Sequence, residues 1–321
     1  MNSTVNEIYF QLRLLLEEAV KRNLTEGILL SGGLDTSILA VPASKFGSLK
    51  AFTAALQGAP APDVEYATLM ANYLQLKHLI YYFDRDELYD AIEMVVKVMR
   101  SFDPMEIRNS VTVYVALRAA RDEGLSSVMT GDGCDELFAG YSFLFDLEKE
   151  ELELELRKLW NVMSFSSIPL AKDLGIEARL PFLDPDLKSY AMSLDPRYKI
   201  RSERGRVWGK WVLRKAFEGA LPEEVVWRAK APIEEGSGTA TLPNLFSREI
   251  PDVEFEEKRS EYLDKDKVAI RDKEQMFYYE IYRSVIGVPH PTNPKGKRCP
   301  QCSSNVAERA IHCRTCGAYP I

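Results

Sequence analysis

Short apolar runs alternate with longer amphipathic stretches through the first 130 residues of the chain. The apolar runs cover residues 27–31, 50–56, 78–83 and 126–130, and the stretches between them carry apolar residues at helical spacing. This alternation predicts βαβ units, in which parallel strands form one sheet with helices on both faces. Ligands of such α/β folds bind at the carboxyl ends of the strands, so the segments that follow the runs are the first candidates for a site.

The rest of the chain has a different pattern. After about residue 165 the alternation fades, and helical patterns interrupted by prolines predict a helical C-terminal part. Gly, Pro and Glu are abundant in 231–260, which we interpret as a loop or lid. Three prolines, a glycine and three cations in 289–298 predict a linker. We therefore expect a main domain over 1–288, that linker, and a small module over 299–321.

Composition and charge exclude several classes of protein. The chain has 321 residues, 46% of them hydrophobic and 28% charged, which is typical of a soluble globular protein. No uncharged apolar run reaches the roughly 18 residues of a membrane span, and the charged N-terminus does not resemble a signal peptide, so we expect a cytoplasmic protein. The net charge of −7 argues against a protein that coats nucleic acid over its whole surface. From Pro289 onward, however, five cations oppose one carboxylate, which makes the tail basic.

A glycine-rich segment, SGGLDTS, follows the first apolar run and opens the helical stretch after it. Glycines here let backbone N–H groups approach a ligand, and the start of a helix adds the positive end of its dipole, so a bound phosphate is favoured. A carboxylate beside a phosphate needs a cation between the two, which makes Asp35 a candidate Mg²⁺ ligand. A plain Gly-Gly turn with a hydroxyl that caps the helix is the alternative. The candidate ATP-binding residues are Ser31, Gly32, Gly33, Asp35, Thr36 and Ser37.

Four motifs together resemble one family. SGGLDTS is similar to the pyrophosphate loop of the N-type ATP pyrophosphatases, which split ATP into AMP and pyrophosphate, and it lacks the ending of a Walker loop. The same motif or a close variant occurs in argininosuccinate, GMP and NAD synthetases and in tRNA-thiolating enzymes. TGDGCDELFAGY, GIEARLPFLDPDL and KWVLRKAFEGALPEEVVWRAKAPIEEGSG resemble the synthetase domain of asparagine synthetase and of β-lactam synthetase. The resemblance implies a parallel-sheet ATP pyrophosphatase domain, adenine nucleotide α-hydrolase-like in fold.

The resemblance also implies roles for single residues. Gly131 would keep the backbone open beside ATP, and Asp135 would be the second Mg²⁺ ligand. Asp132 would be the acid/base group, where asparagine synthetases usually carry glutamate. Lys230 would neutralise charge that develops at the reacting carbonyl and the α-phosphate. Just upstream of GIEARLPFLDPDL, the family usually has a segment with arginine and methionine, and this chain has SSIPLAKDL instead. This difference leaves the identity of the carboxylate substrate open.

Other residues of these motifs have structural interpretations beside the functional ones. We interpret Glu177, Arg179 and Asp184 as a buried polar brace rather than as substrate contacts. Glu136 either caps the helix that starts at this place or belongs to the site. Cys134 stands where the family usually has serine, and we interpret it as a small half-buried residue rather than as a reactive thiol.

The start of the chain bears on the source of the nucleophile. Glutamine-using asparagine synthetases carry an N-terminal glutaminase domain whose nucleophile is a cysteine directly after the initiator Met. Here Asn2 stands at that place, and no cysteine precedes Cys134. We therefore expect ammonia to come from solution or from a separate glutaminase, or a different nucleophile to take its place.

Four of the five cysteines form two CxxC pairs near the end of the chain. Thiolates from two tight turns can complete a tetrahedron around a metal, so this spacing predicts a structural Zn²⁺ site in a zinc ribbon. Iron is the alternative metal. His312 adjoins one pair, but four cysteines already suffice and we expect it to be a bystander. The ligands are Cys299, Cys302, Cys313 and Cys316.

Three functions are compatible with these motifs. The first is an AMP-forming ligase that adenylates a carboxylate and amidates it, as in the synthesis of asparagine from aspartate. The second is a tRNA-modifying enzyme that activates a nucleoside carboxylate or carbonyl for amidation or thiolation, with the basic ribbon on tRNA. Thiolation would need catalytic thiols, and only Cys134 lies outside the ribbon. The third is an inactive nucleotide sensor or scaffold, which the presence of Asp35, Asp135 and Lys230 disfavours; the ribbon itself could instead dock a protein.

Overall fold

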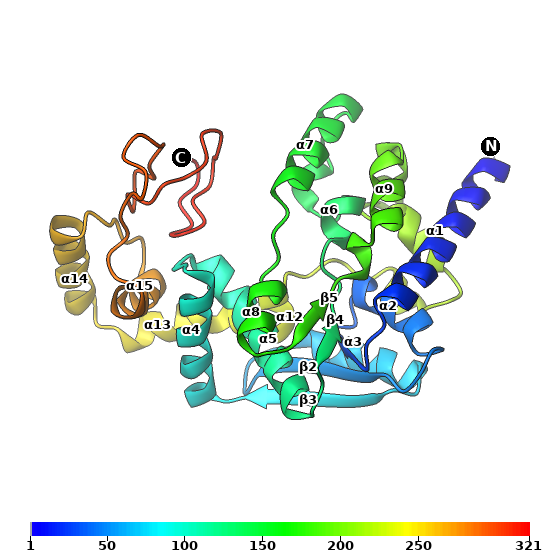
Figure 1. Ribbon diagram of the computed structural model, residues 1–321, viewed down its shortest axis with the longest axis horizontal. Coiled ribbons are helices and arrows are strands. Elements are labelled where there is room, and N and C mark those ends of the chain that lie inside the picture. The colour runs from blue at the N-terminus through cyan, green and yellow to red at the C-terminus, as the bar shows by residue number, and fades with distance from the viewer. Residues whose placement is uncertain (1) are drawn as a thin grey trace. The chain divides into compact units, whose positions relative to one another are not determined.

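The computed structural model describes residues 2–321, and the order of its elements can be followed in Figure 1. Its main sheet has the strand order β3-β2-β1-β4-β5. Strand β1 is parallel to both β2 and β4, and β4 is parallel to β5. The predicted α/β class with a parallel sheet is therefore confirmed. The strands are β1 (Gly27–Leu29), β2 (Lys50–Leu56), β3 (Lys77–Phe83), β4 (Ser127–Met129) and β5 (Glu177–Arg179).

The apolar runs predicted four of these strands. Three of them, β1, β2 and β4, are central strands, which a parallel sheet buries on both faces, whereas β3 lies at the edge. The five central residues of β2 are all buried, and β2 spans the predicted residues 50–56. Strand β5 is a different case, since its three residues, Glu-Ala-Arg, show no apolar run. Pairing with β4 makes β5 a strand, which no local pattern predicted.

Fifteen helices are present in the described part of the chain, together with a small antiparallel hairpin, β6 (Arg201–Glu203) and β7 (Arg206–Trp208). The helices are α1 (Asn2–Arg22), α2 (Leu34–Ala43), α3 (Pro62–Tyr73), α4 (Arg85–Met99), α5 (Pro104–Asp122), α6 (Cys134–Phe138), α7 (Lys149–Val162), α8 (Ser167–Asp173), α9 (Pro185–Ser193), α10 (Trp211–Phe217), α11 (Glu223–Val226), α12 (Ile233–Ser237), α13 (Leu242–Glu249), α14 (Asp252–Lys265) and α15 (Lys273–Val285).

The interpretation of 231–260 as a loop or lid is wrong, since α12, α13 and the first part of α14 occupy this stretch. Its prolines lie at helix starts: Pro232 and Pro251 are N-cap residues, and Pro243 is in the first turn of α13. Proline is tolerated at these positions because the first N–H groups of a helix have no partner inside the helix. Here the prolines begin helices instead of interrupting them.

The chain divides into two compact units. The first unit comprises the described residues up to Thr53, together with Pro62–Tyr81 and Ala116–Ala231. The second unit comprises Ala54–Ala61, Tyr82–Val115 and Pro232–Ile321. A large apolar core lies in the first unit, where side chains such as Leu16, Ile38 and Phe138 are fully buried. The predicted boundaries at 288 and 298 stay a prediction.

No helix in the described part of the chain is both long and apolar enough to cross a membrane.

Candidate active site

Two loops of the first unit meet at the carboxyl ends of neighbouring strands. SGGLDTS follows β1, and Gly131–Asp135 follows β4, the strand that pairs with β1. The chain adds β2 and β3 on one side of β1 and β4 and β5 on the other, which makes this position the switch point of the sheet. A Cβ added to Gly131 would lie 3.1 Å from Thr36 Cγ2 and 3.2 Å from Asp35 Cβ, so the two loops are packed against each other.

The first loop leaves the N-terminus of α2 open. Gly33 is the N-cap residue, and no side chain caps the helix. A Cβ added to Gly33 would meet only Ser31 Oγ, at 3.2 Å. The hydroxyl of Ser37 is buried and has no partner in the described structure. Open backbone N–H groups, free space and an unpaired hydroxyl are what a phosphate group of ATP requires, so these residues fit that ligand.

Gly32 is required for the path of this loop. Its φ is +65°, and a Cβ there would lie 2.1 Å from the carbonyl carbon of Tyr66 in α3. We expect Gly32→Ala to destabilise the protein by about 2 kcal/mol or more, because it combines a left-handed backbone with a steric clash. Thermal unfolding followed by circular dichroism measures the effect. Gly33→Ala is the matched control and should unfold close to the parent, whereas equal losses in both variants would contradict the steric argument.

A buried lysine joins the two candidate metal carboxylates. Lys210 Nζ lies 2.7 and 2.6 Å from the two oxygens of Asp35 and 2.7 Å from Asp135 Oδ1. Burial would lower the pKa of Lys210, but the two carboxylates outweigh burial and raise it. Burial would raise the pKa of Asp135, yet Lys210 and Lys230 together hold it below its usual value. Asp135 and Lys210 are therefore both charged at ordinary pH.

Lys230 completes this cluster from the loop before α12. Its Nζ lies 2.5 Å from the other oxygen of Asp135 and 4.7 Å from the centre of the Tyr141 ring. About a third of the Lys230 side chain is exposed, so its ammonium can face a ligand. The hydroxyl of Tyr141 donates to Glu136 Oε1 at 2.6 Å, and Gly133 occupies the N-cap position of α6. The interpretation of Glu136 as the helix cap is therefore wrong.

Asp132 lies in the second loop and has two hydroxyl partners. Thr130 Oγ1 donates to Asp132 Oδ2 at 3.0 Å, and the Ser167 hydroxyl makes a short hydrogen bond to the same oxygen. Burial raises the pKa of the Asp132 carboxyl, with Asp135 and Asp35 adding to that effect against the two hydroxyls. Ser167 belongs to SSIPLAKDL, so the stretch that departs from the family wording supplies a direct partner of Asp132.

Of the remaining predictions for the site, some agree with the structure and others do not. Asp184 is buried and accepts two hydrogen bonds from Arg22, as expected of a brace. Glu177 is mostly exposed and pairs with the partly exposed Arg179, so these two residues are not a buried brace. Cys134 is fully buried rather than half-buried, and burial raises the pKa of its thiol well above the usual value, in agreement with a structural role.

Sequence reasoning missed two residues that organise the site. Lys210 and Arg228 lie in the fourth family motif, but no local pattern distinguishes them from surface cations. Arg228 Nη1 donates to the carbonyl of Ser31 at 3.0 Å, and Nη2 lies 2.6 Å from Asp63 Oδ1. Its guanidinium also lies 3.9 Å from the centre of the Tyr66 ring, so Arg228 holds the SGGLDTS loop against the start of α3.

The second unit contains the four-cysteine cluster. All four sulfurs lie within 4.8 Å of one another, with 3.6 Å between Cys299 and Cys316 and 3.7 Å between Cys302 and Cys313. These distances exclude disulfides, whose sulfurs are about 2.05 Å apart. Four sulfurs at about 2.3 Å from one tetrahedral centre would be about 3.8 Å apart. His312 faces Asp103 instead, with 3.3 Å between Nε2 and Oδ2, and is not part of the cluster.

A parallel α/β sheet whose switch point carries an open helix N-terminus and paired carboxylates defines a nucleotide-binding class of protein. The family model described as asparagine synthase matches residues 11–173 and 170–271, and the chain belongs to this family. The glutamine-hydrolysing asparagine synthetase of Sandersonia aurantiaca is 33% identical over 259 residues, which cover 73% of this chain and 49% of that protein. Asparagine synthetase B of Escherichia coli K12, also named glutamine-hydrolysing, is 31% identical over 306 residues, covering 87% and 54%.

The chain thus spans about half the length of the curated relatives that it matches. Among solved structures, an NH3-dependent NAD synthetase from Campylobacter jejuni aligns at 17% identity with a TM-score of 0.31, covering 77% of this chain and 97% of that one. The family and its relatives support an ATP-using enzyme of the ligase type.

Proposed function

We propose that this protein activates the carboxylate of a small acid with ATP and converts it to an amide, with aspartate and ammonia as substrates. The observation that carries the proposal is the cluster of Asp35, Asp135, Lys210 and Lys230 at the meeting point of the two loops. The names of the relatives, all asparagine synthetases, support aspartate as the acid. The same cluster argues against an inactive scaffold, which would have no use for four buried or half-buried charges.

In the first step a carboxylate oxygen of the acid attacks the α-phosphorus of ATP, and pyrophosphate leaves. The open N-terminus of α2 would bind the departing phosphates with the hydroxyls of Ser31 and Thr36. Asp35 and Asp135 would hold Mg²⁺, since carboxylate oxygens are its preferred ligands and both already surround a cation, the Lys210 ammonium. When bound, the metal would neutralise charge on the phosphates.

In the second step ammonia attacks the acyl carbon, AMP leaves, and the nitrogen loses a proton. Lys230, with its partly exposed ammonium, would stabilise the negative charge on the carbonyl oxygen and the α-phosphate. Asp132 would accept the proton, because a carboxylate whose pKa is raised by burial is a better base than an ordinary one. The hydroxyl of Ser167 would orient the Asp132 carboxylate.

The four-cysteine cluster would hold one structural zinc ion. Its sulfur-only donor set and its distances suit Zn²⁺, and four protein ligands leave no position for a substrate. Iron would accept the same ligands and is the alternative. In this role the metal supplies folding free energy and takes no part in the reaction.

A tRNA substrate is the second candidate function, and the exposed cations Lys295, Arg298 and Arg309 of the tail favour it. Lys297 is not available for this purpose, because its ammonium donates to the carbonyls of Ala310 and Ile321. A separate glutaminase as the source of ammonia is a further proposal, which the names of the glutamine-hydrolysing relatives motivate.

The intact protein should release pyrophosphate from Mg-ATP only when aspartate is present, and should form one asparagine per pyrophosphate when ammonium is added. Mass spectrometry of the product and a pyrophosphate assay measure the two quantities. Parallel reactions contain glutamate, no acid, or tRNA in place of aspartate. Pyrophosphate release that depends on tRNA and ignores aspartate would replace the first function by the second.

A further inference from the structure

We infer that metal in the four-cysteine cluster orders helix α12, the segment directly after Lys230, through the N-terminal turns of α5. The inference rests on the proposed zinc ion and on the proposed role of Lys230. Every contact from the cysteines to α12 joins residues of the second unit, and Lys230 precedes α12 in the chain. We call residues 299–321 the cysteine module.

The cysteine module is hydrogen-bonded to the rest of the second unit through its second CxxC turn, residues 313–317, which we call the knuckle. The carbonyl of Thr315 accepts from the N–H of Phe102 at 2.7 Å, and the carbonyl of Arg314 accepts from the hydroxyl of Ser101 at 2.8 Å. The carbonyl of Cys316, a metal ligand, accepts from Arg271 at 3.0 Å and from the buried Gln275 at 2.7 Å. These contacts tie the cysteine module to residues of the second unit that are distant in the sequence.

These acceptors keep their positions only if the knuckle is folded. A segment as short as the cysteine module has no core of its own, and metal binding is what folds modules of this size. Without the metal, the carbonyls of 314–317 would no longer form a fixed set of acceptors for residues 101, 102, 271 and 275.

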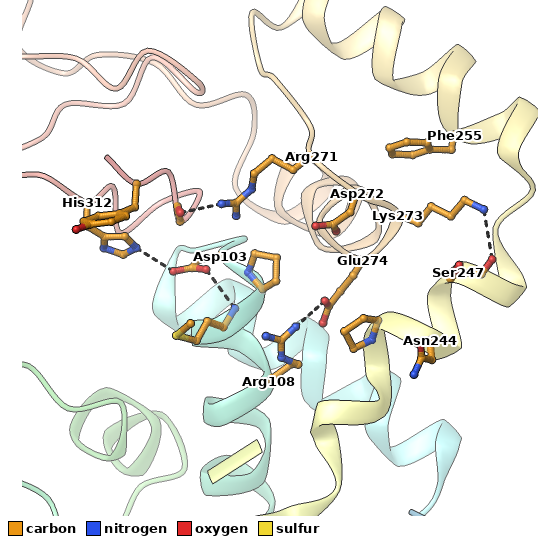
Figure 2. Close-up of a pocket in the computed structure, with 15 residues that line it drawn as sticks. Asp103, Arg108, Asn244, Ser247, Phe255, Arg271, Asp272, Lys273, Glu274 and His312 are labelled. Carbon is orange, nitrogen blue, oxygen red and sulfur yellow. Dashed lines mark hydrogen bonds and ion pairs between the residues drawn. The ribbon is translucent and has the colours of Figure 1, made fainter. Parts of the chain in front are cut away.

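The start of α5 lies directly against this knuckle. Figure 2 shows His312 pointing at Asp103, which precedes the first residue of α5, with 3.3 Å between the two side chains. Asp103 Oδ1 accepts from the N–H of Met105 at 3.2 Å and so caps the helix. A Cβ added to Gly317 would lie 2.3 Å from that same oxygen, so the knuckle and the helix start are in close contact. The position of the first turn of α5 therefore depends on the knuckle.

Helix α5 in turn holds α12. Arg108 Nε donates to Glu234 Oε2 at 2.7 Å, and Nη1 donates to the buried Glu274 at 2.8 Å, as Figure 2 shows for the second bond. Asn109 Oδ1 accepts from the N–H of Glu234 at 3.0 Å, and Thr112 Oγ1 donates to Ser237 Oγ at 2.8 Å. Because a helix of five residues is not stable alone, α12 depends on these contacts.

Lys230 lies three residues before the first residue of α12. An ordered α12 is a fixed anchor for the short segment that carries the Lys230 ammonium, whereas a melted α12 would let this segment move. We therefore expect metal removal to loosen the segment that carries Lys230. The effect would pass in turn through the knuckle, Asp103, Arg108 and Glu234.

The experiment is hydrogen exchange on the intact chain before and after zinc removal by a chelator, with zinc content measured in parallel. Amides of 299–317 should lose protection, and those of 101–112 and 233–241 should exchange about 10-fold faster or more, since local openings of contacts such as these set exchange rates. Amides of β1 and β4 should not change. Unchanged exchange in 233–241, or a loss of protection in every segment including β1 and β4, would overturn the inference.

Two variants, each with a matched control, sharpen this test. Cys302→Ser should lose the zinc and reproduce the effect of the chelator, whereas Cys134→Ala, which changes the buried cysteine of the first unit, should keep one zinc per chain. Arg108→Met should speed exchange in 233–241 while zinc stays bound, and Arg121→Met, an exposed change on the same helix, should not. No effect of Arg108→Met on 233–241 would contradict the path. Exchange needs no substrate, so failure of the proposed reaction would leave these results intact.

Discussion

Replacing Asp35 by asparagine is expected to lower the rate of pyrophosphate release by about 10³-fold or more, because a metal ion that polarises a phosphoryl group contributes several kcal/mol. Asp35 accepts from the buried Lys210 through both oxygens, and the amide of asparagine would offer no charge to either a lysine or a metal. The loop itself should keep its path, since Arg228 and the packing of Gly32 hold it independently. A pyrophosphate assay at saturating ATP measures the rate.

Thermal unfolding of the same variant distinguishes lost chemistry from lost structure. Asp186→Asn is the matched control, because two thirds of that side chain is exposed. The control should keep full activity. Full activity in Asp35→Asn would show that Asp35 holds no metal, and would contradict the assignment of this loop as the ATP site.

Replacing Lys230 by alanine is expected to lower kcat by about 10²–10³-fold, the usual loss when one donor to a developing negative charge is removed. Asp135 would keep Lys210 as its partner at 2.7 Å, so the cluster should not be left with an unpaired carboxylate. The affinity for ATP should stay within a few-fold of the parent, as measured by isothermal titration. Single-turnover kinetics locate the loss in the chemical step.

Lys172→Ala, a change at the exposed end of α8, is the control for a lost surface lysine and should have no effect. A collapse of ATP affinity in Lys230→Ala, with the chemical step unchanged in the remaining complex, would make Lys230 a phosphate ligand. The role proposed above would then be wrong.

The family motifs located most of the candidate site, but not its central cation. Asp35, Asp135 and Lys230 each lie in a recognisable sequence motif, and the structure brings all three into one cluster. Lys210 was missed because it lies 175 residues from Asp35 in the chain and is one of many lysines without a distinctive neighbour. Only the packing of α10 against the two loops shows that its ammonium is buried between carboxylates.

Local sequence patterns determined those features of the protein that depend on residues close together in the chain. Runs of apolar residues determined the central strands, paired glycines determined the turn after β1, and the CxxC spacing determined which sulfurs could meet, because each depends on residues within a few positions of one another. The tertiary structure decided the rest. Strand β5 pairs with β4, α12 is hydrogen-bonded to α5, and Ser167 became the partner of Asp132 through the fold. Contacts between residues so distant in sequence have no periodic signature, and only the folded chain brings them within bonding distance.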